Sequence, residues 1–470
     1  MRSLRNACRR QLNWRNGAYA LLLLSVTTMT ALQAQTFTVL HSFDGTDGTS
    51  PASGLVQATN GDLYGTTLGG GLGESEGGDG TVFKITPGGT LTMLHSFDVT
   101  DGAGLQGGLV QATNGDLYGT AEAGGANDDG TVFKITLSGT LTTLYSFPQS
   151  SGDLANPTAT LVQATNGDFY GATNFGNVET IFKITPGGTT TALNYISYGF
   201  ASQALVQASN GLLYGTTWGG GNYTNCRYGC GSVSEITLSG TLTTLYSFDV
   251  TDGSDPVGLV QATNGDFYGT TANGGANDVG TVFKITPSGT LTTLHSFDCT
   301  DGCSPIAGLI QGTDGNLYGT TEFGGTGGGN GYGTVFEITP SGTLTTLHNF
   351  VGTDGYQPTG LVQATNGVFY GTTEAGGANG DGTVFSLSVG LGPFVETQTT
   401  LGKVGGAVKI LGTDLTGATS VRFNGTPAVF KVMSSSSITA TVPTGATTGF
   451  VTVVTPSGSL KSNTKFTVVP

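Results

Sequence analysis

The chain has 470 residues, of which 81 are glycine and only 10% are charged, and its formal net charge is −15. Glycine follows no three-residue period, which excludes a collagen-like rod, and the acidic balance argues against nucleic acid or anionic lipid as a partner. Gly and Thr alternate with Val, Leu, Phe and Tyr, a composition typical of short strands and tight turns and so of an all-β protein.

Residues 1–34 have the pattern of a signal peptide. A start with five arginines precedes the apolar run Ala18–Val26, and Leu32-Gln33-Ala34 is suited to cleavage. The apolar run is too short to cross a bilayer, although an uncleaved anchor is the alternative. Cleavage would remove five of the 16 basic residues and none of the 31 acidic ones, leaving a net charge of −20. We therefore expect a secreted or cell-surface protein with no membrane span in the mature chain.

A motif first seen as LVQATNGDLYGTT at Leu55–Thr67 occurs seven times after the leader. Its tyrosine recurs at Tyr64, Tyr118, Tyr170, Tyr214, Tyr268, Tyr318 and Tyr370. Each copy contains four strand-like runs, which in the fifth copy are Leu259–Thr263, Phe267–Thr271, Thr281–Thr286 and Leu291–Phe297. Four antiparallel strands in a repeat of about fifty residues are typical of one blade of a β-propeller.

Two kinds of connection separate these strands. Asn264-Gly265-Asp266 predicts a type I′ hairpin between the first two strands, and Pro287-Ser288-Gly289 predicts a turn between the last two. Both are short and uniform, and they share one end of the ring. The longer connections, from second to third strand and from fourth strand to the next blade, share the other end. Variable loops gathered on one face usually mark where binding occurs.

The two ends of the repeat region complement each other. The run Phe37–Phe43 resembles the fourth strand of a blade, and the seventh copy stops after Thr383–Val389 without a fourth strand of its own. Pairing these ends would close the ring and remove two exposed strand edges. We predict a seven-bladed β-propeller over residues 36–389, closed by the N-terminal strand.

The repeated strings LVQATNGDLYGTT, GGANDVGTVFKIT and SGTLTTLHSF resemble the GloVer-type tandem repeat of choice-of-anchor exported bacterial proteins, over residues 36–389. That family is known mainly as repeats with a variable anchoring end. The resemblance implies a secreted or cell-surface protein and assigns no activity.

From Pro393 the repeat stops and about seven short strands follow, among them Ala407–Leu411, Ser420–Phe423 and Phe450–Val454. This spacing predicts a small immunoglobulin-like β-sandwich over 393–470. The string VKILGTDLTGATSVRFNGTPAVF, followed by ITATVPTGATTGFVTVVTPSG, resembles the IPT/TIG family, which implies a spacer or adhesive module. Some TIG domains bind DNA, but Arg422 and a few lysines give little positive charge for that, and we expect no nucleic acid.

Most residues with catalytic chemistry occupy the same position in several repeats. These sets are His41, His95, His295 and His348; Lys84, Lys134, Lys183 and Lys284; and Asp62, Asp116, Asp168 and Asp266. Because a reaction needs one site rather than seven, such positions are interpreted as structural. The loops Asp44–Gly48, Asp98–Gly102, Asp249–Gly253 and Asp298–Gly302 are interpreted as Asx-type turns. Calcium bound by their carboxylates is the alternative.

Three glutamates, Glu122, Glu322 and Glu374, follow the second strand of their blades. Paired carboxylates of this kind would suit glycoside hydrolysis, but all three precede similar Gly-Gly loops and again look like features of the repeat. We therefore predict no catalytic residues, no enzyme and no cofactor.

The loop of the fourth repeat departs from the pattern. It contains Trp218, Tyr223, Cys226, Arg227, Tyr228 and Cys230. Aromatic residues with an arginine suit sugar stacking or a protein hot spot, so Trp218, Tyr223, Arg227 and Tyr228 form the candidate ligand site. An insertion without a function is the alternative.

In an exported protein the close pairs Cys226/Cys230 and Cys299/Cys303 predict two disulfides, with zinc as the alternative. The hypothesis that follows is a monomeric, exported binding or adhesion scaffold that presents one propeller face to an extracellular glycan or surface protein. The alternative is a polysaccharide-active enzyme or its carbohydrate-binding accessory protein.

Overall fold

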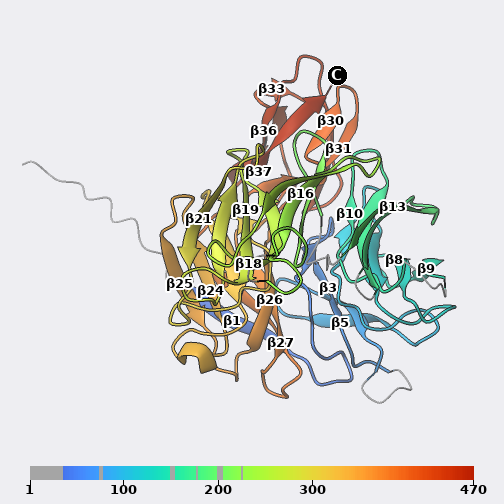
Figure 1. Ribbon diagram of the computed structural model, residues 1–470. Helices are drawn as coiled ribbons and strands as arrows, with labels where there is room; N and C mark the ends of the chain where they lie inside the picture. The colour runs from blue at the N-terminus through green and yellow to red at the C-terminus, as the bar shows by residue number, and fades with distance from the viewer. Residues whose placement is uncertain are drawn as a thin grey trace, which may run out of the picture.

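A computed structural model describes residues 35–72, 78–148, 154–175, 178–197, 205–223 and 226–469. The chain forms a seven-bladed β-propeller followed by a curled sheet that stacks on one end of the ring (Figure 1). The predicted signal peptide lies outside the described residues. Within them the helical structure is limited to η1 (Gly328–Asn330), and no helix has the length and hydropathy to span a membrane.

Each blade is a four-stranded antiparallel sheet with its strands in chain order. Blades 1 and 2 comprise β2 (Val56–Gln57), β3 (Leu63–Thr67), β4 (Thr81–Ile85), β5 (Leu91–Ser96), β6 (Val110–Gln111), β7 (Leu117–Ala121), β8 (Thr131–Ile135) and β9 (Leu141–Ser146). Blades 3 and 4 comprise β10 (Val162–Gln163), β11 (Phe169–Phe175), β12 (Val178–Ile184), β13 (Thr190–Ser197), β14 (Val206–Gln207), β15 (Leu213–Thr217), β16 (Ser232–Ile236) and β17 (Leu242–Ser247). Blades 5 and 6 comprise β18 (Ser254–Gln261), β19 (Phe267–Asn273), β20 (Thr281–Ile285), β21 (Leu291–Ser296), β22 (Ile310–Gln311), β23 (Leu317–Thr321), β24 (Thr334–Ile338) and β25 (Leu344–Asn349).

Blade 7 draws strands from both ends of the repeat region. It contains β26 (Tyr356–Gln363), β27 (Phe369–Ala375) and β28 (Thr383–Ser388), and β1 (Thr36–Ser42) lies beside β28. The β1–β28 pair is antiparallel and in register from Thr36↔Ser388 to Ser42↔Thr383, with one bulge. Phe43, directly after β1, is fully buried and makes an edge-to-face contact with Phe83 of blade 1 at 5.2 Å.

The hairpin between the first two strands of a blade differs from the predicted type I′ turn. In blade 5 the Gly265 N–H donates to the Ala262 carbonyl at 2.9 Å, and the Ala262 N–H donates to Asp266. Gly265 has a φ of 93°, whereas Asn264 is not among the residues with positive φ. A type I′ turn needs positive φ at both central residues, so this is a type I turn followed by a glycine bulge. Asn264 instead donates to the Tyr268 hydroxyl at 2.9 Å.

A ring of glutamines joins each blade to the next at the hairpin end, the end of the ring that carries these turns. In every blade the glutamine that ends the first strand accepts a hydrogen bond, at 2.8–3.1 Å, from a backbone N–H in the hairpin of the preceding blade. The seven are Gln57, Gln111, Gln163, Gln207, Gln261, Gln311 and Gln363. The amide of each also donates to the hairpin glycine carbonyl of its own blade. The repeated Gln-Ala-Thr-Asn-Gly string therefore forms hydrogen bonds between blades as well as within them.

The C-terminal module contains nine strands that hydrogen bond into one curled sheet. They are β29 (Val395–Thr397), β30 (Leu401–Lys403), β31 (Ala407–Gly412), β32 (Ser420–Phe423), β33 (Thr426–Pro427), β34 (Phe430–Val432), β35 (Ser437–Thr441), β36 (Gly449–Thr455) and β37 (Gly458–Val469). The long β37 pairs with β36 and also, in parallel, with β29 and β30. Hydrogen bonds therefore run without a break between the strand groups that we expected to form two sheets, and the apolar residues lie inside the curl.

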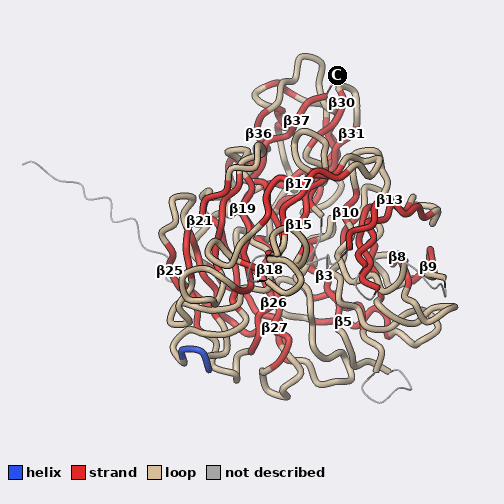
Figure 2. The backbone as a smooth tube through the Cα atoms, viewed as in Figure 1, coloured by secondary structure: helices blue, strands red, loops and turns tan. Residues whose placement is uncertain are grey.

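This module covers the hairpin end of the propeller. The Gln398 amide donates to the Ala112 carbonyl at 2.7 Å, and the Lys409 ammonium donates to Thr113 at 3.0 Å, both in the first hairpin of blade 2. Ser436 donates to Thr59 of blade 1 at 2.8 Å. The other end of the ring, which we call the loop end, points away from the module, as the position of η1 shows (Figure 2). The loop end is therefore the end of the propeller that the module leaves uncovered.

Candidate functional site

The candidate site lies at the loop end, between blades 4 and 5. Trp218 directly follows β15, in the position that Ala272 occupies in blade 5 and Glu322 in blade 6. Its side chain is 41% exposed. Blade 4 therefore places a large, partly exposed aromatic ring directly after its second strand.

A disulfide fixes the loop opposite Trp218. Cys226 and Cys230 are bonded, as predicted, with their Cα atoms 5.2 Å apart. The Gly220 N–H donates to the Tyr228 carbonyl at 2.8 Å, so the loop is tied back to the residues that follow Trp218. The Arg227 guanidinium lies over the Tyr228 ring at 5.1 Å, a cation–π distance. The loop therefore holds its cation and its aromatic ring together.

These residues line an open pocket of about 410 Å³. Its lining includes Trp218, Arg227 and Tyr228 from blade 4, Asp255 and Asn273 from blade 5, and Ile306 from the start of blade 6. The volume falls within the range of small-molecule sites. Of the four predicted ligand residues the structure brings three together here. Tyr223 is exposed but does not line the pocket.

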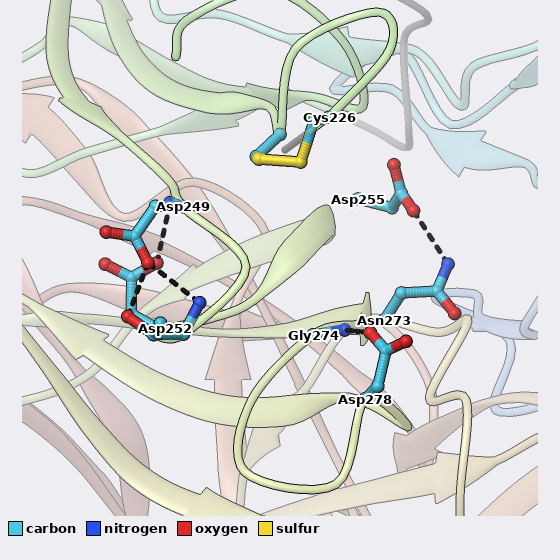
Figure 3. Close-up of a disulfide and its surroundings, with 9 residues drawn as sticks. Cys226, Asp249, Asp252, Asp255, Asn273, Gly274 and Asp278 are labelled. Carbon is cyan, nitrogen blue, oxygen red and sulfur yellow. Dashed lines mark hydrogen bonds between the residues drawn. A yellow bond between two sulfur atoms is a disulfide. The ribbon is translucent and has the colours of Figure 1, made fainter. Parts of the chain in front are cut away.

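Asp255 and Asn273 form a polar pair in the pocket lining (Figure 3). The Asp255 carboxylate accepts a hydrogen bond from the Asn273 amide at 2.7 Å. Burial raises the pKa of this carboxyl, against the lowering effect of the Asn273 hydrogen bond. Asp255 also has a φ of 56°, a left-handed backbone conformation that is uncommon outside glycine. The site therefore combines two aromatic rings, one cation and a carboxylate–amide pair.

Sequence reasoning missed Asp255, Asn273 and Ile306 because they belong to the neighbouring blades. One signal in the sequence was available. Aligning the repeats places Ala272-Asn273 at the positions of Trp218-Gly219, and equivalent positions in adjacent blades lie side by side in a propeller.

The prediction of a second disulfide is wrong. Cys299 and Cys303 are free thiols in the structure. Backbone hydrogen bonds hold both residues in place. The Gly325 N–H donates to the Cys299 carbonyl at 2.9 Å, and the backbone of Cys303 forms an antiparallel β-bridge with Phe323. Burial, followed by the thiol–thiol hydrogen bond to Cys299, raises the pKa of Cys303 to about 12. A thiol whose pKa is raised forms less of the thiolate from which disulfide formation starts.

The residues that recur among blades make contacts that recur too. His41, His95, His295 and His348 each bond an aspartate six residues later, at 2.6–2.9 Å. In the Asp44–Gly48 loop, the Asp44 carboxylate accepts from the Thr46 N–H and hydroxyl, which is an Asx turn. Lys84, Lys183 and Lys284 lie 3.6–3.9 Å from Asp62, Asp168 and Asp266. Among the described residues, no group of three or more His, Cys, Asp or Glu is arranged to hold a metal ion.

Of the glutamates Glu122, Glu322 and Glu374, the last two lie in neighbouring blades and the first lies in blade 2. Glu122 in blade 2 accepts a hydrogen bond from Gln106. Glu322 accepts one from Gln357 at 2.6 Å, and its pKa is raised by burial and, to a smaller extent, by the charge of Glu374 in the next blade. Glu374 is thus close enough to Glu322 to influence it, whereas Glu122 lies in blade 2.

The repeats match the Gloeobacter/Verrucomicrobia repeat family over residues 25–227 and 201–426. The chain belongs to this family. The resemblance of the repeated strings to the GloVer-type repeat is thereby confirmed, and the IPT/TIG domain matches residues 394–468. No curated protein matches the chain.

Solved structures agree with the propeller fold of this Gloeobacter/Verrucomicrobia repeat protein. Virginiamycin B lyase from Staphylococcus aureus, a catalytically inactive variant crystallised with quinupristin, is 16% identical with a TM-score of 0.55. The match covers 76% of this chain and 99% of the lyase. A second crystal structure of that enzyme has 15% identity, a TM-score of 0.52 and the same coverage. At such identities the similarity shows the fold alone.

Proposed function

We propose that this protein is an exported or cell-surface binding scaffold whose loop end takes a glycan in the pocket between blades 4 and 5. The observation that carries the proposal is the pocket itself, where Trp218, Tyr228 and Arg227 are gathered around the hydrogen-bonded Asp255–Asn273 pair. Aromatic rings stack on the apolar faces of sugar rings, and carboxylate, amide and guanidinium groups bond sugar hydroxyls. A surface protein with a matching hot spot is the other ligand class.

Three further features belong to this proposal. Residues 1–34 would direct export and be removed. The pairing of β1 with β28, with the Gln57–Thr365 hydrogen bond at 2.9 Å between blades 1 and 7, supports a ring closed by the N-terminal strand. The C-terminal module, which occupies the hairpin end, would act as a spacer that keeps the loop end exposed. In this arrangement the protein acts as a monomer.

The test is a glycan array together with a pull-down of cell-surface proteins, both with the full chain. We expect a restricted set of glycans to bind, and the double variant Trp218→Ala/Arg227→Ala to lower affinity for them at least about tenfold. Tyr195→Ala is the matched control, because Tyr195 is 56% exposed but lies on β13 of blade 3, away from the pocket. Binding that survives in the double variant would rule out this pocket.

One observation favours a second candidate, polysaccharide hydrolysis. Burial and, to a smaller extent, the charge of Glu374 in the next blade raise the pKa of Glu322, and glycosidases use a pair of carboxyl groups. Product analysis of every glycan that binds separates the candidates. Shorter sugars that appear with the parent chain and disappear with Glu322→Gln would assign an enzyme, and intact glycans would support the binding scaffold.

A further inference from the structure

The loop end carries a second group of aromatic side chains, between blades 6 and 7. Phe323 follows Glu322 at the end of the second strand of blade 6, Tyr332 lies in the next loop, and Tyr356 begins β26 of blade 7. The Tyr356 ring is 5.4 Å from Tyr332 in an edge-on contact and 6.0 Å from Phe323. Tyr332 is 45% exposed, and the other two are half-buried. We call Phe323, Tyr332 and Tyr356 the second aromatic site.

This site adjoins the pocket between blades 4 and 5. Ile306 lines that pocket, and it follows Cys303 and Ser304 by only a few residues. Cys303 and Phe323 exchange two backbone hydrogen bonds at 2.9 and 3.1 Å, and the Glu322 N–H donates to Ser304 at 3.0 Å. The segment that carries Ile306 is thus hydrogen bonded to the segment after β23 that carries Phe323. The two sites follow each other around the loop end from blade 4 to blade 7.

We propose that the two sites form one continuous track that binds several consecutive units of a neutral polysaccharide, with the second aromatic site holding the units beyond the pocket. This inference rests on the proposed function of the pocket. Separate aromatic platforms along one face fit an extended ligand better than a single sugar, because each ring stacks on its own unit.

The polar groups along the track determine which kind of polymer fits. Asp255 lies in the pocket, and Glu322 and Glu374 lie beside the second aromatic site. The Glu322 carboxylate accepts from the Gln357 amide. Arg227 is the single arginine among residues 35–389, so acidic groups outnumber it, and the whole chain carries a net charge of −15. A polymer of uronic acids or sulfated sugars would be repelled, whereas neutral hydroxyl groups can bond every one of these side chains.

The test measures affinity against oligomer length by calorimetry. The probes are cello-, manno- and xylo-oligosaccharides from dimer to hexamer, with oligogalacturonates of equal length as the acidic counterpart. For at least one neutral series we expect affinity to rise by about tenfold or more between dimer and hexamer, as units reach the second aromatic site. If no neutral hexamer binds at millimolar concentration, or if the acidic series binds more tightly, the proposal is wrong.

The double variant Tyr332→Ala/Tyr356→Ala separates this inference from the proposed function. It should lower hexamer affinity about tenfold and leave dimer affinity unchanged, whereas Trp218→Ala should lower both. Unchanged hexamer binding in the tyrosine variant, with a loss in Trp218→Ala, would overturn the track and leave the pocket in place. Unchanged binding in both would overturn the pocket as well. Far-ultraviolet circular dichroism of each variant checks that the propeller is still folded.

Discussion

Replacing Phe43 by alanine is expected to lower the free energy of unfolding by about 3–5 kcal/mol, the usual cost of removing a buried phenylalanine from a core. Phe43 comes directly after β1 and is fully buried, with its ring against Phe83 of blade 1. Its N–H donates to Gly382 of blade 7 at 3.0 Å. Phe43 therefore packs between the last blade and the first. Chemical denaturation measures its contribution to the free energy of unfolding.

Phe97→Ala is a closely matched control. Phe97 is also fully buried, contacts Phe133 edge-on at 5.0 Å, and donates from its N–H to Gly80 at 2.9 Å. It occupies the same position between blades 1 and 2, where the chain is continuous. If β1 closes the ring, the two variants should lose similar stability. A loss below about 1 kcal/mol for Phe43→Ala, beside the full loss for Phe97→Ala, would mean that the N-terminal strand does not complete blade 7.

The second large effect concerns Glu179 on β12 of blade 3. Its side chain is 4% exposed, and Oε2 has no hydrogen-bond partner among the described residues. Burial raises the pKa of this carboxyl from 4.5 to about 8. The folded protein therefore keeps a proton that the unfolded chain has already lost. The contribution of Glu179 to the free energy of unfolding is fully present below about pH 4.5. It falls by about 1.4 kcal/mol per pH unit as the pH rises towards 8.

We expect the wild-type protein to lose about 3 kcal/mol relative to Glu179→Gln between about pH 5 and about pH 7.5. The glutamine has nearly the same size but does not titrate, so the difference between the two stability curves isolates Glu179. Denaturation midpoints at several pH values provide the measurement. Curves that stay parallel over this range would show that the carboxyl is ionised in the folded protein.

The position of Glu179 also shows a limit of the repeat pattern. Six blades have a glycine directly before the third strand, for example Gly280 with a φ of 101°. A Cβ there would lie 2.4 Å from the Thr271 carbonyl oxygen and 2.7 Å from Pro305 of the next blade. Blade 3 has Glu179 instead, and Glu179 is not among the residues with positive φ. The substitution is plain in the aligned repeats, but the burial of the side chain is seen only in the structure.

The arrangement within a blade could be predicted because it depends on local spacing. The tyrosine motif, the turn residues and the strand runs predict the four strands of blade 5, and β19, β20 and β21 match their expected ranges to within a few residues. β18 begins at Ser254, earlier than expected, because it continues through a bulge between Val257 and Leu259.

Contacts between blades could be predicted only in part. Trp218, Arg227 and Tyr228 were predicted because their loop breaks the repeat, whereas Asp255 and Asn273 enter the pocket from blade 5, outside that loop. The two cysteine pairs have the same spacing but different bonding: Cys226 and Cys230 form a disulfide, whereas Cys299 and Cys303 are free thiols. Spacing alone does not contain this information.

The most direct measurement of the central claim, that ligands bind at the loop end, uses the fluorescence of Trp218. The chain has two tryptophans, Trp14 and Trp218, so the variant Trp14→Phe leaves Trp218 as its single tryptophan. Titration with a neutral glycan that binds by calorimetry should change the Trp218 emission saturably, with the dissociation constant that calorimetry gives. A glycan that binds by calorimetry and leaves this emission unchanged would place the binding site elsewhere and contradict the account.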